Sequence, residues 1–184
     1  MKISIIALLC ISLMSCNPQS SSLHDLKTSD SWNPELKLEE LGIVLPDPSS
    51  PVANYVNAVR SGNLLFLAGK GPSLSDGSYI TGKVGEDLDI EEGREAARLV
   101  GIAQLAVLKK ELGDLNKVKR IVKVLGMVNC GPDFNQQPQV INGFSDLMVE
   151  VFGEKGKHAR SAVGLNSLPM NIAVEIELIV EIED

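Results

Sequence analysis

The stretch HARSAVGLNSLPMNIAVEIE, at residues 158–177, decides the fold and raises the first question about function. It places Arg160 in a run of Ala, Val and Leu that is typical of a strand, and a turn at Leu168-Pro169 separates this run from a second strand. Because arginine cannot lose its charge, an Arg among apolar residues needs an anionic partner from the protein or from a ligand. The fork of N–H donors on a guanidinium suits a small carboxylate.

The second strand, at residues 172–182, is the most regular in the chain, because its apolar residues alternate with a second set rich in glutamate. Outward from it, we predict strands at residues 54–59, 63–68, 79–84, 118–128 and 159–165, and helices at residues 90–112 and 140–152. The order β-β-β-α-β-α-β-β predicts an α+β fold, with one mixed sheet and both helices on one face. The other face then needs cover, which a homo-oligomer would supply.

The composition of the 184-residue chain fits one globular domain with a tail. Its 17 Lys and Arg against 24 Asp and Glu leave a net charge of −7. This argues against a nucleic acid as the main ligand, because phosphate backbones need clustered Lys and Arg. The three cysteines, Cys10, Cys16 and Cys130, have neither the pattern of a disulfide framework nor metal-site spacing.

The first sixteen residues have the layout of a signal peptide. Lys2 precedes a mostly apolar run at residues 3–14, which is too short to span a bilayer comfortably. The ending Leu13-Met14-Ser15-Cys16 resembles a bacterial lipobox, in which the cysteine becomes acylated. We therefore expect a protein of the bacterial cell envelope that contacts the membrane only through a lipid on Cys16. A plain secretory signal and a soluble secreted or periplasmic protein are the alternative.

The predicted domain organisation has three parts. Residues 1–16 are the signal peptide, residues 17–50 a flexible tether and lead-in, and residues 51–184 the folded domain. The tether contains Ser20-Ser21-Ser22 and several prolines, which break regular structure. Within it, residues 35–41 could form a short helix that ends at Gly42.

The element order and five short runs resemble the RidA/YjgF family of reactive-intermediate deaminases. The runs match residues 54–59, 64–69, 140–142 and 159–163, and the fifth joins Leu168-Pro169 to residues 174–177. Among them are the family's Ala-Arg-Ser-x-Val, here at residues 159–163, and its closing Leu-Pro…Val-Glu-Ile-Glu. The resemblance covers about residues 52–181, which is essentially the whole domain.

The resemblance implies a chorismate-mutase-like fold and a homotrimer with ligand clefts between subunits. It also implies hydrolysis of enamine or imine intermediates to 2-keto acids and ammonia, without metal or cofactor. By resemblance, Arg160 would hold the substrate carboxylate, and Glu175 would position or activate the attacking water. The cleft would be lined by Tyr55, Gly69 and Asn142, and the backbone of Ala162 would contact the substrate nitrogen.

The chain departs from the family at several points. Ala162 stands where the family commonly has Cys, Ala68 stands where it has Ser, and the connection at residues 126–139 is longer than in short members. These departures indicate a divergent branch, similar to the YjgF/chorismate-mutase-like proteins that are often labelled endoribonucleases.

Each candidate also has a structural interpretation. Arg160 could bridge to Glu175 or Glu177, and Glu175 could belong to the solvent face of its strand. Tyr55 could be a packing residue, Asn142 a local helix cap and His158 a residue of the rim. We therefore expect an imine deaminase, with a non-catalytic module for a small acid as the alternative. An endoribonuclease ranks last, because the chain is acidic and has no basic stripe.

Overall fold

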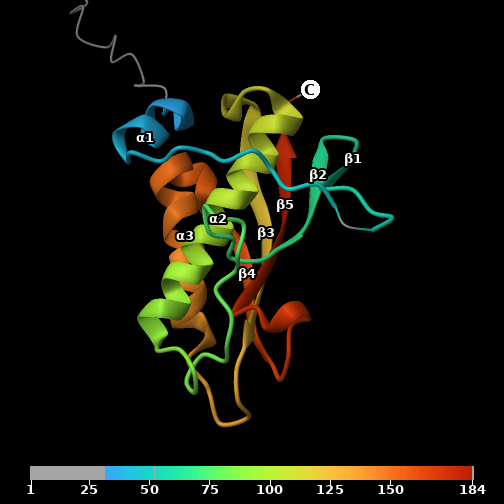
Figure 1. The fold of residues 1–184 in the computed structure, drawn as a ribbon. Coiled ribbons are helices and arrows are strands. Elements are labelled where there is room, and N and C mark those ends of the chain that lie inside the picture. The colour runs from blue at the N-terminus through green and yellow to red at the C-terminus, as the bar shows by residue number, and fades with distance from the viewer. Residues whose placement is uncertain (1–31, 52, 184) are drawn as a thin grey trace, which may run out of the picture. The chain divides into compact units, whose positions relative to one another are not determined.

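The computed structural model describes residues 32–51 and 53–183 of the chain (Figure 1). The predicted signal peptide with Cys16 and the first half of the predicted tether lie outside these residues. The helices and strands are α1 (Pro34–Glu40), β1 (Ala58–Ser61), β2 (Leu64–Lys70), α2 (Ile90–Leu112), β3 (Val118–Asn129), α3 (Gln137–Phe152), β4 (Ala159–Leu165) and β5 (Val174–Ile182). None of the helices in the described residues is long and apolar enough to cross a membrane.

The strands form a mixed five-stranded sheet in the order β1-β2-β5-β3-β4. Only β3 and β4 are parallel, and α3 makes the crossover between them. Helix α2 packs on β2 and β5, and α3 packs on β3 and β4, so both long helices cover the same face (Figure 1). The predicted α+β fold, with a mixed sheet under two helices, is confirmed.

The core lies between this face and the two helices. Alternate residues of β5, from Val174 to Ile182, are buried under α2 and α3, which confirms the predicted alternation. The two helices approach closely at Gly143, where any Cβ would collide with the carbonyl oxygen of Arg94. Helix α2 begins with a capping box between Asp89 and Glu92, in which each side chain accepts a backbone N–H of the other residue.

The predicted strand at residues 79–84 is wrong. This segment makes only isolated bridges, such as Ser73 to Tyr79 and Thr81 to Ile172. Gly82 within the segment has a φ of 119°, which is incompatible with an extended run, and Gly77 and Gly85 on either side of it have φ values of 84° and 90°.

The first hairpin also differs from the prediction. Strand β1 starts at Ala58 instead of residue 54 and runs to Ser61, and a two-residue turn at Gly62-Asn63 joins it to β2. Gly62 has a φ of 61°, which glycine adopts without strain and which tight hairpin turns require.

The compact unit of the chain begins at Trp32. The indole Nε1 of Trp32 donates a hydrogen bond to the carbonyl oxygen of Val151, 2.7 Å away, and Leu38 of α1 is buried. Glu35 accepts a hydrogen bond from the backbone N–H of Leu115 and pairs with Lys109 at 2.7 Å. Helix α1, which the sequence placed in the lead-in, therefore packs on the domain.

Candidate functional site

Arg160 on β4 is partly buried, and neutral side chains hold it in place. Its Nη1 donates hydrogen bonds to Oδ1 of Asn142 and to Oγ of Ser145, both at 3.0 Å and both from α3. Within the described residues, no carboxylate lies within 4 Å of the guanidinium. In a single chain, the predicted alternative of a bridge to Glu175 or Glu177 is therefore wrong, and the part of the chain that the structure describes supplies no anionic partner for the guanidinium.

The hydrogen bonds continue from Arg160 to His158, which the sequence suggested as a residue of the rim. His158 Nε2 lies 3.0 Å from Ser145 Oγ, and His158 Nδ1 lies 2.7 Å from the carbonyl oxygen of Gly156. Because a carbonyl can only accept, Nδ1 carries the hydrogen, and Nε2 of the neutral ring accepts from the Ser145 hydroxyl. Burial lowers the pKa of His158, and the nearby charge of Arg160 lowers it further, against the opposing effect of the Gly156 hydrogen bond. Burial and the charge of Arg160 thus both favour the neutral ring of His158.

Glu175 lies on the other side of the sheet. Its neighbours Val174 and Ile176 are fully buried under the helices, so the alternation of β5 turns Glu175 towards the open face. The carboxylate lies against Gly69, where any side chain would collide with it. Burial raises the pKa of Glu175, and the like charge of Glu177 raises it further. A carboxylate of this kind accepts protons more readily than an exposed one.

A β-bulge sets the approach between Gly69 and Glu175. Leu67 pairs with Leu178 and Lys70 pairs with Ile176, so Ala68 and Gly69 together oppose one residue of β5. The fully buried Gln104 of α2 supports this irregularity, because its Nε2 donates to the carbonyl oxygens of Ala68 (2.9 Å) and Ile176 (2.8 Å). Sequence reasoning missed Gln104, although an amide among the apolar residues of a helix face was a usable signal.

The six predicted site residues thus fall into separate groups. Asn142, Arg160 and Ala162 lie on the helix side, with Ala162 packed against the core. Gly69 and Glu175 meet on the open side. Tyr55 precedes β1 and is 49% exposed. A single chain therefore brings Arg160 to Asn142 and Gly69 to Glu175, but it does not bring Arg160 to Glu175.

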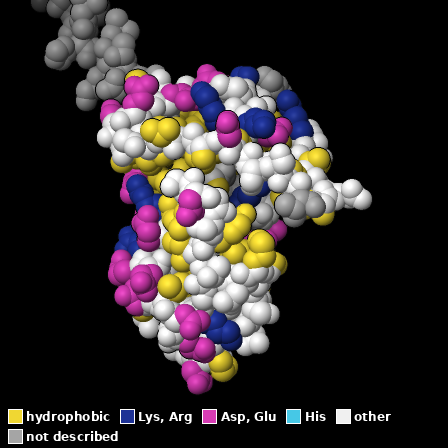
Figure 2. Space-filling view, viewed as in Figure 1, with side chains coloured by type: hydrophobic (Ala, Val, Ile, Leu, Met, Phe, Trp, Pro, Cys, Tyr) yellow, Lys and Arg dark blue, Asp and Glu magenta, His cyan; other side chains and the backbone are white. Residues whose placement is uncertain are grey.

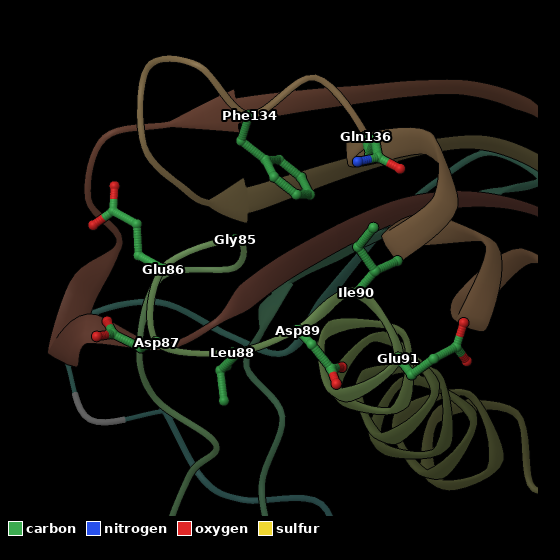
Figure 3. A pocket seen from close by; sticks show the side chains of 9 residues that line it. All are labelled: Gly85, Glu86, Asp87, Leu88, Asp89, Ile90, Glu91, Phe134 and Gln136. Atoms are coloured by element: carbon green, nitrogen blue, oxygen red, sulfur yellow. The ribbon is translucent and has the colours of Figure 1, made fainter.

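A cavity of about 690 Å³ lies elsewhere, at the start of α2 (Figure 3). Four carboxylates line it, next to the ring of Phe134, and acidic side chains crowd this end of the molecule (Figure 2). Two of the four are used locally, since Asp87 accepts from the N–H of Lys83 and Asp89 caps α2. The residues described include no group of three His, Cys, Asp or Glu arranged for a metal ion. A cavity with this charge repels a carboxylate ligand.

Cys130 lies in the loop after β3 and is buried. Its Sγ is 3.7 Å from Nε2 of Gln137, beside a small cavity of about 190 Å³. Burial in this environment favours an inert thiol.

Comparison with known proteins decides the family. The sequence model of the family described as "YjgF/chorismate mutase-like, putative endoribonuclease" matches residues 35–182. The chain belongs to the YjgF/RidA family. Protein TCP17 of Trypanosoma cruzi is 43% identical over 148 residues, which cover 80% of this chain and 92% of that protein.

Two further relatives of this YjgF/RidA protein bear on its fold and function. A 2-iminobutanoate/2-iminopropanoate deaminase of Dermatophagoides farinae is 31% identical over 142 residues, which cover 77% of this chain and 95% of the relative. A crystal structure of a protein of unknown function from Agrobacterium tumefaciens has 46% sequence identity and a TM-score of 0.76, and the match covers 83% of this chain and 96% of that one. The predicted family and fold are thereby confirmed.

Proposed function

We propose that this protein hydrolyses small imine or enamine acids to 2-keto acids and ammonia. The observation that carries the proposal is the partly buried guanidinium of Arg160, which neutral groups orient and which forms no ion pair with a carboxylate of residues 32–51 or 53–183. Such a group gains a charge-assisted, two-pronged contact when a small carboxylate binds. The deaminase named among the relatives supports the same substrate class.

In the proposed reaction, Arg160 binds the carboxylate of the substrate and fixes its imine carbon. Glu175, whose pKa is raised, takes a proton from a water molecule as the water oxygen bonds to that carbon. The imine nitrogen gains a proton, and the resulting carbinolamine releases ammonia as the C=O bond forms. One water is consumed for each 2-keto acid and ammonia produced, and no redox step is required.

The proposed assembly is a homotrimer in which Arg160 and Asn142 of one subunit meet Gly69 and Glu175 of the next. The separation of these two groups on opposite sides of one sheet supports a cleft that needs two copies. The open face of the sheet supports contact between copies, because it exposes large apolar side chains around a groove of about 400 Å³. Phe66 lines the groove and is 41% exposed, and Val163 and Leu165 of β4, outside the groove, are 39% and 38% exposed.

The test is imine hydrolysis by the purified protein. An amino-acid oxidase generates the imine, semicarbazide competes for it, and Arg160→Ala is compared with the parent and with Arg98→Ala. Arg98 is a matched control, because it pairs with Glu150 on the outer surface of the helices. Faster keto-acid release that Arg160→Ala abolishes and Arg98→Ala preserves is the expected result.

The same experiment separates the alternatives. No acceleration with several amino-acid imines, together with carboxylate binding that needs Arg160, would establish a non-catalytic binding module. RNA cleavage that persists through repeated purification would favour the endoribonuclease, against the net charge of −7.

The proposed location is the bacterial cell envelope, with a lipid on Cys16 as the only membrane contact. The expected result for Cys16→Ala is loss of the protein from the membrane fraction with the folded domain intact. A soluble parent protein would instead favour the plain secretory signal.

A further inference from the structure

A further cavity lies on the helix side of β2 and belongs to neither group of candidate residues. It measures about 270 Å³, and Ala103 and Val107 of α2 form its apolar wall. The opposite walls are residues 46–49 of the segment after α1 and the loop at residues 73–79. Since Glu175 lies on the open face and Arg160 lies on β4, three places away from β2 in the sheet, this cavity is separate from both.

Lys70 supplies the one cationic side chain in the wall of this cavity. It is partly buried, and its Nζ donates to Oδ1 of Asn57 at 2.6 Å. Asn57 is held in turn, because its Nδ2 donates to the carbonyl oxygen of Ser49 at 3.0 Å. No carboxylate of the described part of the chain lies within 4 Å of Lys70 Nζ. The ammonium group is thus positioned by a neutral amide while its charge stays without an anion.

The loop that closes the cavity is held by its own hydrogen bonds. Ser73 and Tyr79 form a bridge, and the N–H of Leu74 donates to the carbonyl oxygen of Ser78 at 2.8 Å. Asp76 accepts from both the N–H and the hydroxyl of Ser78. The cavity is therefore formed before any ligand binds, which lowers the entropic cost of binding.

We propose that this cavity binds a small organic monoanion, with its carboxylate on Lys70 and a short apolar chain against Ala103 and Val107. Burial penalises the charged form of Lys70, and a bound carboxylate relieves that penalty. The volume lies below the range of about 300–1,000 Å³ typical of drug-sized ligands, so the ligand has only a few carbon atoms. The exposed carboxylate of Asp47 on the rim disfavours a second negative charge.

The test follows butanoate binding by NMR in Arg160→Ala protein, so that the cleft proposed above does not contribute to the signal. The expected result is saturable shifts of the backbone amides of Gly71, Tyr79 and Ala103. Butanamide, which has the same shape without the charge, and the dianion succinate should bind at least about tenfold more weakly, as expected for loss of a charge-assisted contact.

Variants assign the binding to Lys70. Lys70→Met should weaken butanoate binding about tenfold or more, and Lys70→Arg should retain most of it. Lys83→Met is the matched control, because Lys83 also donates to an asparagine oxygen, that of Asn166, but lines no such cavity. Ala103→Leu should abolish binding by filling the cavity. Circular dichroism checks that each variant is folded.

Three results would overturn the proposal: no saturable shifts at these amides, equal binding of butanamide, or unchanged binding by folded Lys70→Met protein. None of them depends on imine hydrolysis, so failure here leaves the deaminase proposal intact.

Discussion

The two sides of the sheet hold their candidate groups by different means. On the helix side, a chain of side chains from α3 and the segment before β4 orients Arg160. On the open side, an irregular strand brings the backbone of Gly69 against Glu175, and Gln104 holds that irregularity from beneath. The helix-side arrangement orients Arg160, which is always charged. The open-side arrangement raises the pKa of Glu175, a group that can gain and lose a proton. Each set of contacts forms within one chain, so the proposed trimer needs only to place Arg160 of one subunit near Glu175 of the next.

Gly69→Ala should have the largest effect, because a methyl group at this position displaces the Glu175 carboxylate. If Glu175 is the general base, kcat should fall roughly 100-fold or more, close to the value of Glu175→Gln. Steady-state imine hydrolysis measures this. Gly113→Ala is the control, since Gly113 lies at the end of α2 with a φ of 74° and has open space around it. It should lower stability and leave kcat unchanged. Full activity of Gly69→Ala would remove Glu175 from the mechanism.

Gln104→Leu should have the next largest effect, this time on stability. The buried carbonyl oxygens of Ala68 and Ile176 lose a donor, which costs about 1–3 kcal/mol of unfolding free energy. Urea unfolding checks this value. The same change at the exposed Gln139 of α3 should alter stability by less than about 0.5 kcal/mol. Equal effects at both positions would show that the bulge does not depend on Gln104.

Ser145→Ala tests the helix side and should have a smaller effect. Arg160 loses one of two acceptors and His158 loses its donor, so we expect KM to rise about 2- to 10-fold, the equivalent of one neutral hydrogen bond. The value of kcat should hardly change, because the substrate contact is weakened in ground state and transition state alike. Ser167→Ala, at an exposed position, is the control. A fall in kcat at constant KM would contradict a positioning role.

The contributions of His158 and Glu175 to folding stability should change with pH in opposite directions. This is the smallest of the expected effects. The folded state lowers the pKa of His158 from 6.5, so the unfolded chain binds more protons and stability is lost as pH falls below about 6.5. The folded state raises the pKa of Glu175 from 4.5, so stability is lost as pH rises from about 4.5 through the folded pKa. The free energy of unfolding of each variant should be measured across pH 4–8. His158→Gln should lose the dependence on pH near 6.5, and Glu175→Gln should lose the dependence on pH above about 4.5.

The sequence predicted the features that depend on local patterns. The alternation along β5, the two long helices and the position of Arg160 on a strand all follow from short-range periodicity. It missed the features that depend on contacts between distant residues. Gln104 reaches a backbone oxygen 36 positions away, and Ser145 joins His158 to Arg160 only once α3 docks beside β4. The failed strand at residues 79–84 shows a third limit, because its β-forming residues do not reveal that Gly82 among them takes a positive φ.

The place of β5 in the sheet has a consequence for how the protein is made. Strand β5 is the last element of the fold, yet it lies between β2 and β3 and pairs with both. While the ribosome is still adding residues 174–182, the β1–β2 hairpin and the β3–α3–β4 unit have no strand to join them. The apolar faces of α2 and α3 therefore stay incompletely covered until residues 174–182 have been made, and a nascent chain stalled before β5 is a natural client for a chaperone.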